Sequence, residues 1–127
     1  MKATQLLNNA LAILATTKDQ SPEYADFAVP LINLLLMQTF ECNNSIRSAK
    51  GLQELDEVYE IESLEDELPC ENELAREALP LGLCARFVMD EDDMAKVAYY
   101  QNEYVAAVQD AGRWTCTKIK DVYGGTE

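Results

Sequence analysis

The side chains of this sequence that could do chemistry are carboxylates and cysteines, because the chain contains no histidine. Without an imidazole there is no proton carrier for neutral pH, no Ser–His or Cys–His nucleophile pair and no His-containing zinc site. The cysteines stand far apart in the sequence, so there is no Cys-x-x-Cys motif: Cys42, Cys70, Cys84 and Cys116. We therefore expect the thiols to behave as small hydrophobic groups, and we predict no metal ion and no cofactor.

The carboxylates are concentrated in residues 54–77, which hold 11 of the 23 acidic residues. A pair of carboxylates could hydrolyse a glycoside, but one member must then lie in a pocket that raises its pKa. Nothing in the sequence signals such a pocket, and the acidic run at 90–93 lacks the spacing of a calcium loop. We predict a solvated acidic surface, no catalytic residue and no enzyme activity. The residues at its centre are Glu54, Asp56, Glu57, Glu60, Glu62, Glu65, Asp66 and Glu67.

The overall charge limits the classes of partner. The chain has 127 residues, enough for one domain, and a formal charge of −13. Such a charge opposes non-specific binding to nucleic acid or to anionic membranes, both of which need a basic surface. The longest apolar run, 27–37, contains Pro30 and Asn33 and falls short of the about 20 residues of a membrane helix. Because Asn8 and Asn9 also interrupt any signal-peptide core, we expect a soluble, reduced domain made inside the cell.

The elements that must position these groups are predicted to be helices, since apolar residues recur at helical spacing. The spacing predicts four helical blocks, at about 3–15, 21–47, 71–89 and 90–113. Ser21-Pro22 is a typical helix start, and Pro30 is expected to bend the second block. Apolar residues surround 31–37 almost completely, so we expect this stretch to be the most deeply buried. We expect Gly82 to let another helix approach closely.

The acidic middle, about 51–70, does not follow a helical pattern. Apolar and acidic residues partly alternate between 57 and 62, and this alternation allows a short strand at 59–63. Mutual repulsion of the carboxylates equally allows an extended arm or loop. The predicted fold is therefore all-α: a small bundle of about four helices, with an irregular acidic arm or loop between the second and third.

The C-terminal residues 114–127 are predicted to form a tail that follows a helical domain of residues 1–113. Aromatic and basic residues are mixed at this end of the chain: Arg113, Trp114, Lys118, Lys120 and Tyr123. Two interpretations remain open at this point. The segment is either a docking tail for another protein or a last helix that packs on its own bundle.

The order of these features resembles the head–tail connector proteins of tailed bacteriophages, also called adaptor or head-completion proteins. The similarity covers about residues 3–111. It is carried by Leu6-Leu7-x-x-Ala10-Leu11, by Leu31-Ile32-Asn33-Leu34-Leu35 and by Asp92-Asp93-Met94-Ala95-Lys96. Its most specific part is the acidic loop ending in Leu68-Pro69, followed by Ala78-Leu79-Pro80-Leu81-Gly82-Leu83-x-Ala85.

The resemblance implies a helical bundle with a protruding arm, assembled as a ring of roughly a dozen copies through which DNA passes. The ring would bind the portal protein on one side and a tail or stopper protein on the other. Its location would be the virion, after assembly in the host cytoplasm. The segment 113–123 would be a portal-docking segment, and part of 54–77 would face the DNA channel or its rim.

Two rival functions come from other classes. An acidic inhibitor that mimics DNA and binds a host DNA-binding protein would agree with the charge of −13. Such a mimic is expected to spread carboxylates over its whole surface, whereas here almost half of them fall in one stretch. A carboxylate-dependent hydrolase is disfavoured, because no histidine and no buried acid are signalled.

Overall fold

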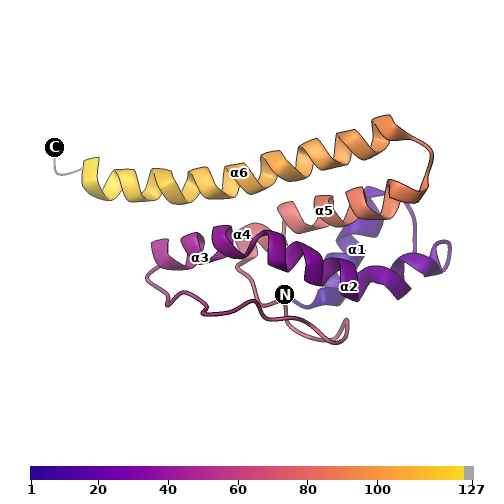
Figure 1. The fold of residues 1–127 in the computed structure, drawn as a ribbon, viewed down its shortest axis with the longest axis horizontal. Helices are drawn as coiled ribbons and strands as arrows, with labels where there is room; N and C mark the ends of the chain where they lie inside the picture. Colours follow the sequence, from indigo (N-terminus) through magenta and orange to yellow (C-terminus); the bar gives the residue numbers. More distant parts are fainter. Residues whose placement is uncertain (125–127) are drawn as a thin grey trace.

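The computed structural model describes the backbone of residues 1–124 and the side chains of residues 1–89 and 91–112. The described chain folds into six α-helices and one 3-10 helix, and an isolated bridge between Lys2 and Glu67 is the only β pairing within it (Figure 1). The elements are α1 (Ala3–Ile13), α2 (Pro22–Gln38), α3 (Phe40–Ala49), α4 (Asn72–Ala75), α5 (Ala78–Phe87), η1 (Val88–Asp90) and α6 (Met94–Gly124). The predicted all-α class is confirmed.

The predicted number of four helices is wrong, because two of the blocks are divided. Thr39 divides the second block into α2 and α3: its hydroxyl donates to the Leu35 carbonyl at 2.8 Å, and its backbone (φ −101°, ψ 9°) leaves the helical region. Pro80 accounts for the break between α4 and α5. Proline has no N–H and its ring crowds the carbonyl four residues earlier, which belongs to Arg76, where α4 ends.

The centre of the core is α5, which contacts α1, α2 and α6. Eight of its ten residues are buried. A Cβ on Gly82 would lie 2.8 Å from ring carbons of Tyr104 in α6, so the absence of a side chain lets the two helices pack closely. The close approach expected at Gly82 is confirmed.

Helix α2 is not the most deeply buried element, contrary to the expectation for residues 31–37. Ile32 and Leu35 are buried, but Phe27 is 59% exposed, Leu34 40% and Met37 57%. The buried and exposed residues fall on opposite sides of the helix. Only one side of α2 meets the core, because α5 already occupies the position at its centre.

Helix α6 continues to Gly124, well beyond the end expected near 113. It packs along α5 and α3, and its last turns run past the end of α3 (Figure 1). The side chains predicted to form a docking tail lie outside the described ones: Arg113, Trp114, Lys118, Lys120 and Tyr123.

The acidic segment 51–70 has no helix or strand, so the short strand allowed at 59–63 does not form. It is also not a free arm. It runs along the helices (Figure 1), and it buries Ile61 and Leu68 to 3% and 7% exposure. Burial of these two side chains anchors the segment to the bundle.

Candidate interaction surface

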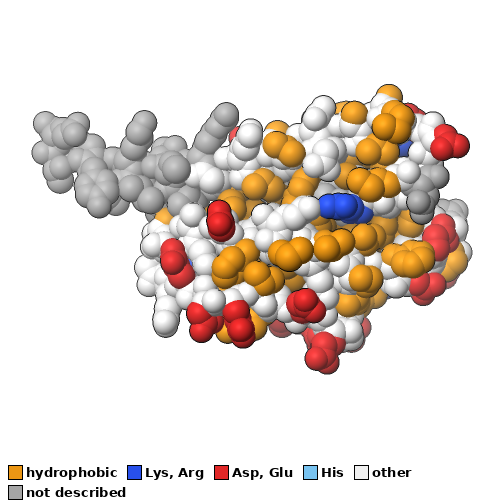
Figure 2. Space-filling model, viewed as in Figure 1, with side chains coloured by type: hydrophobic (Ala, Val, Ile, Leu, Met, Phe, Trp, Pro, Cys, Tyr) orange, Lys and Arg blue, Asp and Glu red, His pale blue; other side chains and the backbone are white. Residues whose placement is uncertain are grey.

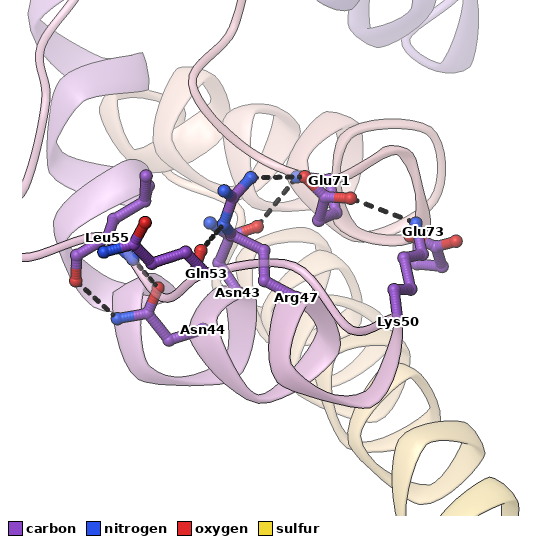
Figure 3. Close-up of polar contacts among 8 residues, drawn as sticks. All are labelled: Asn43, Asn44, Arg47, Lys50, Gln53, Leu55, Glu71 and Glu73. Atoms are coloured by element: carbon purple, nitrogen blue, oxygen red, sulfur yellow. Dashed lines mark hydrogen bonds and ion pairs between the residues drawn. The ribbon is translucent and has the colours of Figure 1, made fainter.

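Two asparagines, Asn33 in α2 and Asn44 in α3, attach the acidic segment to these helices. Asn44 Nδ2 donates to the Leu55 carbonyl at 3.0 Å, while the Leu55 N–H donates to Asn44 Oδ1 at 2.8 Å (Figure 3). Asn33 makes the same pair of bonds with Ile61, at 3.0 and 2.8 Å. The side-chain amide contains both an N–H donor and a carbonyl acceptor, so it pairs with a backbone C=O and N–H as a neighbouring strand would. The irregular segment therefore has a defined position without regular secondary structure.

A small ion-pair cluster fixes the far end of the segment (Figure 3). Glu71 is paired with Arg47 at 3.3 Å and with Lys50 at 3.1 Å, and Lys50 also pairs with Glu73 at 2.7 Å. The bond to Glu73, with further help from Glu71, raises the pKa of Lys50. The buried Asn43 accepts a hydrogen bond from the Glu71 N–H at 2.7 Å. Glu71 and Glu73 are thus neutralised locally and do not belong to the open acidic surface.

The second half of the segment caps the start of α1. The Leu64 carbonyl accepts hydrogen bonds from the N–H of Thr4 at 2.8 Å and from its hydroxyl at 2.7 Å. The first N–H groups of a helix have no partner inside the helix, so these contacts satisfy them. Asp66 accepts from the N–H groups of Glu62 and Ser63, and these bonds lower the pKa of its carboxyl group. This tight turn holds the second half of the segment in place.

The predicted acidic site separates into two groups. Glu67 pairs with the N-terminal amine at 2.9 Å, Glu65 lies 3.6 Å from the Lys2 amine, and Asp66 forms the turn. The other five carboxylates are exposed and form no ion pair with any described residue: Glu54, Asp56, Glu57, Glu60 and Glu62. We call these five the acidic strip.

Sequence reasoning missed a second surface, an apolar groove beside α2. The groove has a volume of about 440 Å³, and Phe27, Leu31, Arg86, Phe87 and Met89 are among the residues that line it. Its wall is fixed by Tyr24, whose ring stacks on that of Phe87 with centroids 4.4 Å apart. Figure 2 shows hydrophobic side chains spread over α2, α5 and α6 on this face, with a basic side chain near the middle. The one feature of the sequence that could have indicated this groove is the apolar character of α2 on all sides, which we interpreted as a sign of deep burial.

The three cysteines whose side chains the structure describes lack the properties of reactive thiols. Cys42, Cys70 and Cys84 are free, and burial raises the pKa of all three thiols, to about 12 for Cys70 and Cys84. A thiol that stays protonated is a poor nucleophile and a poor metal ligand. Within the described residues, no group of three or more Cys, Asp or Glu side chains is arranged to hold a metal ion. None of the described helices combines the length and apolar character needed to cross a membrane.

We compared the chain with known protein families, with curated proteins and with solved structures. None of the three comparisons gave a match. The function proposed below is therefore argued from the two surfaces, the acidic strip and the apolar groove, together with the resemblance carried by the sequence motifs.

Proposed function

We propose that this protein is a non-enzymatic structural adaptor of a tailed-phage particle, which forms a ring between the portal and the tail through which DNA passes. The observation that supports this proposal is that the molecule has two different surfaces available to partners, the acidic strip and the apolar groove. Among the described residues, the acidic strip has no cation as a partner, and no side chain covers the apolar groove or the exposed side of α2. A ring subunit needs both kinds of surface, one for its sister copies and one for the channel.

The acidic strip suits a channel through which DNA moves without binding. Proteins bind DNA largely because their basic side chains displace counterions from the phosphates. The five carboxylates of the strip would repel phosphate, and the asparagine pairs of Asn33 and Asn44 would keep them from folding back. We therefore assign the ends of the strip, Glu54 and Glu62, to the lumen of the ring or its rim.

The partners of the ring are the portal protein on one side and a tail or stopper protein on the other. We assign portal docking to the end of α6, residues 113–123, as the resemblance implies. The support for this assignment is the resemblance itself, together with the continuation of α6 to Gly124. The resulting location is the head–tail interface of the virion, after assembly in the host cytoplasm.

A second candidate function is an acidic inhibitor that imitates DNA. It is favoured by the fixed positions of the carboxylates, because a mimic has to present its charges at constant spacing. Such an inhibitor would bind one basic partner with steep salt dependence and would not form a ring.

The deciding experiment is co-purification with the portal protein of the same phage, with the mass of the complex measured by light scattering. The adaptor proposal predicts a complex with a ring-sized number of copies. A portal protein that never retains this chain, combined with tight and salt-sensitive binding to a basic DNA-binding protein, would reject the adaptor and support the inhibitor.

The lumen assignment has its own test, in which the carboxylates at the ends of the acidic strip are replaced by amides, Glu54→Gln with Glu62→Gln. We expect particles that carry this variant to eject DNA more slowly or to retain it. The matched control neutralises two exposed acids elsewhere on the described surface: Asp19→Asn with Glu41→Gln. Equal ejection by both variants and by the unchanged protein would rule out the lumen assignment.

A further inference from the structure

We infer that residues 56–60 of one copy, which we call the arch, dock in the apolar groove of a second copy around Arg86. This inference rests on the proposed ring and identifies the contact between neighbouring subunits. Asp56, Glu57 and Glu60 then belong to this contact, whereas Glu54 and Glu62 at the ends of the acidic strip stay open to the channel. The arch and the groove are different surfaces of the same chain. A contact between them is therefore heterologous and repeats from copy to copy, which is the kind of contact that closes into a ring.

One side of α2 is apolar but exposed, so it is expected to be covered by a partner. A helix that is apolar on all sides is normally buried on all sides. In α2 the side that carries Ile32 and Leu35 is buried, whereas the side that carries Phe27 and Leu34 faces outwards. These exposed residues continue the wall of the groove, so groove and helix form one apolar surface.

The chemistry of the groove favours an acidic occupant. Arg86 lines it, is only partly exposed and forms no ion pair within the described part of the chain. The nearby Glu91 is already engaged, since it pairs with Lys96 at 3.0 Å and accepts from the Tyr24 hydroxyl at 3.5 Å. The groove also contains the exposed Glu23, which lies at its rim on the first turn of α2. A guanidinium among apolar side chains is best satisfied by a carboxylate that arrives with apolar neighbours.

The arch has the matching chemistry and is already ordered. Its ends are clamped, because Asn44 holds Leu55 and Asn33 holds Ile61. Between the clamps, Val58 is 37% and Tyr59 43% exposed, and three carboxylates flank them. An ordered loop loses little conformational entropy when it binds, so more of the contact energy remains as affinity.

The arch cannot reach the groove of its own chain. Val58 and Tyr59 lie beside Leu36 and Phe40. At about 3.6 residues per turn, Leu36 is half a turn away from Phe27, which lines the groove. The clamps at both ends keep the arch on that side of α2. The occupant must therefore come from a second copy.

The test is a reciprocal change of charge, followed by sedimentation velocity. Arg86→Glu alone, or Asp56→Lys with Glu57→Lys and Glu60→Lys alone, should weaken self-association roughly 30-fold or more. An equimolar mixture of the two variants should associate again, because each arch then meets a groove of opposite charge. Arg76→Glu is the matched control, because Arg76 is exposed and lies outside the groove. This variant should associate as the unchanged chain does. Phe27→Gln removes an apolar contact at a 59% exposed position and should weaken association without unfolding the chain.

Several outcomes would overturn the contact: self-association that survives Arg86→Glu, an equal loss in Arg76→Glu, or a mixture that stays dissociated. A chain that is monomeric up to about 1 mM would also overturn it. These failures differ from failure of the adaptor function, which is read from portal co-purification. A ring that assembles on the portal with Arg86→Glu present would refute the arch contact and keep the function. Association through arch and groove without portal binding would support the arch contact and refute the adaptor function.

Discussion

Asn33 holds Ile61 through both hydrogen bonds of its side-chain amide, at 3.0 Å from Nδ2 to the Ile61 carbonyl and 2.8 Å from the Ile61 N–H to Oδ1. Ile61 is only 3% exposed, so neither backbone group has easy access to water if the amide is removed. The two residues join α2 to the acidic segment, and this junction determines where the arch ends.

Replacement of Asn33 by alanine should therefore lower the free energy of unfolding by about 1–3 kcal/mol, the usual cost of leaving buried polar groups unpaired. Urea unfolding followed by circular dichroism measures the change. Asn8→Ala is the matched control, because Asn8 is exposed on α1 and should change stability by less than about 0.5 kcal/mol. Equal stability of Asn33→Ala and the control would show that the clamp does not stabilise the fold.

Leu34 and Leu35 are neighbours in α2 with opposite environments, 40% and 1% exposed. Leu35→Ala should lower the free energy of unfolding by about 2–5 kcal/mol, since it leaves a cavity in the core. Leu34→Ala should cost about 1 kcal/mol or less, since much of that side chain is in water already. Thermal or urea unfolding compares the stabilities of the two variants directly. A larger loss of stability in Leu34→Ala than in Leu35→Ala would mean that Leu34, and not Leu35, faces the core.

Gly82 and Gly112 make a second matched pair. Gly82→Ala should destabilise the fold by about 1–3 kcal/mol, because the new Cβ would lie 2.8 Å from the Tyr104 ring and 2.9 Å from Leu35 Cδ2. Gly112→Ala meets nothing within 4 Å and should stabilise α6 by about 0.5–1 kcal/mol. Differential scanning calorimetry gives both values. Stabilisation by Gly82→Ala would refute the close packing of α5 against α6.

Stability should fall in alkaline solution because of the buried thiols. Burial raises the pKa of Cys70 and Cys84 from the ordinary 9.0 to about 12, so the folded chain keeps protons that the unfolded chain releases. By linkage, this contribution to the free energy of unfolding is complete below pH 9.0 and is lost as the pH rises towards 12. Urea unfolding across this range should show that the free energy of unfolding declines less in Cys84→Ala than in the unchanged chain. The variant has lost one of the two thiols whose titration causes the decline. An identical pH dependence in both chains would contradict the raised thiol pKa.

The helical elements could be predicted from the sequence because amphipathic spacing is a local property. Ser21-Pro22 marked the start of α2, and Gly82 marked a close helix contact. The division at Thr39 was not predicted. It depends on the hydrogen bond from the Thr39 hydroxyl to the Leu35 carbonyl, which does not alter the apolar pattern.

The sequence shows where the acidic residues are concentrated, but it does not show which of them form ion pairs. Glu65, Glu67 and Glu71 belong to the same acidic stretch as Glu57, yet they pair with cations or the N-terminal amine. Those partners are Met1 and Lys2, just before α1, and Arg47 in α3, all distant in sequence. A count of charges therefore overstated the open acidic surface.

What the sequence determined by itself is the all-α class and the excess of carboxylates, because helix periodicity and net charge depend only on residue types and their order. The tertiary structure decided which side of α2 is covered, which carboxylates stay unpaired and where the acidic segment lies. The physical reason is that burial and ion pairing are relations between distant segments, and the position of α5 at the centre leaves room on α2 for only one buried side.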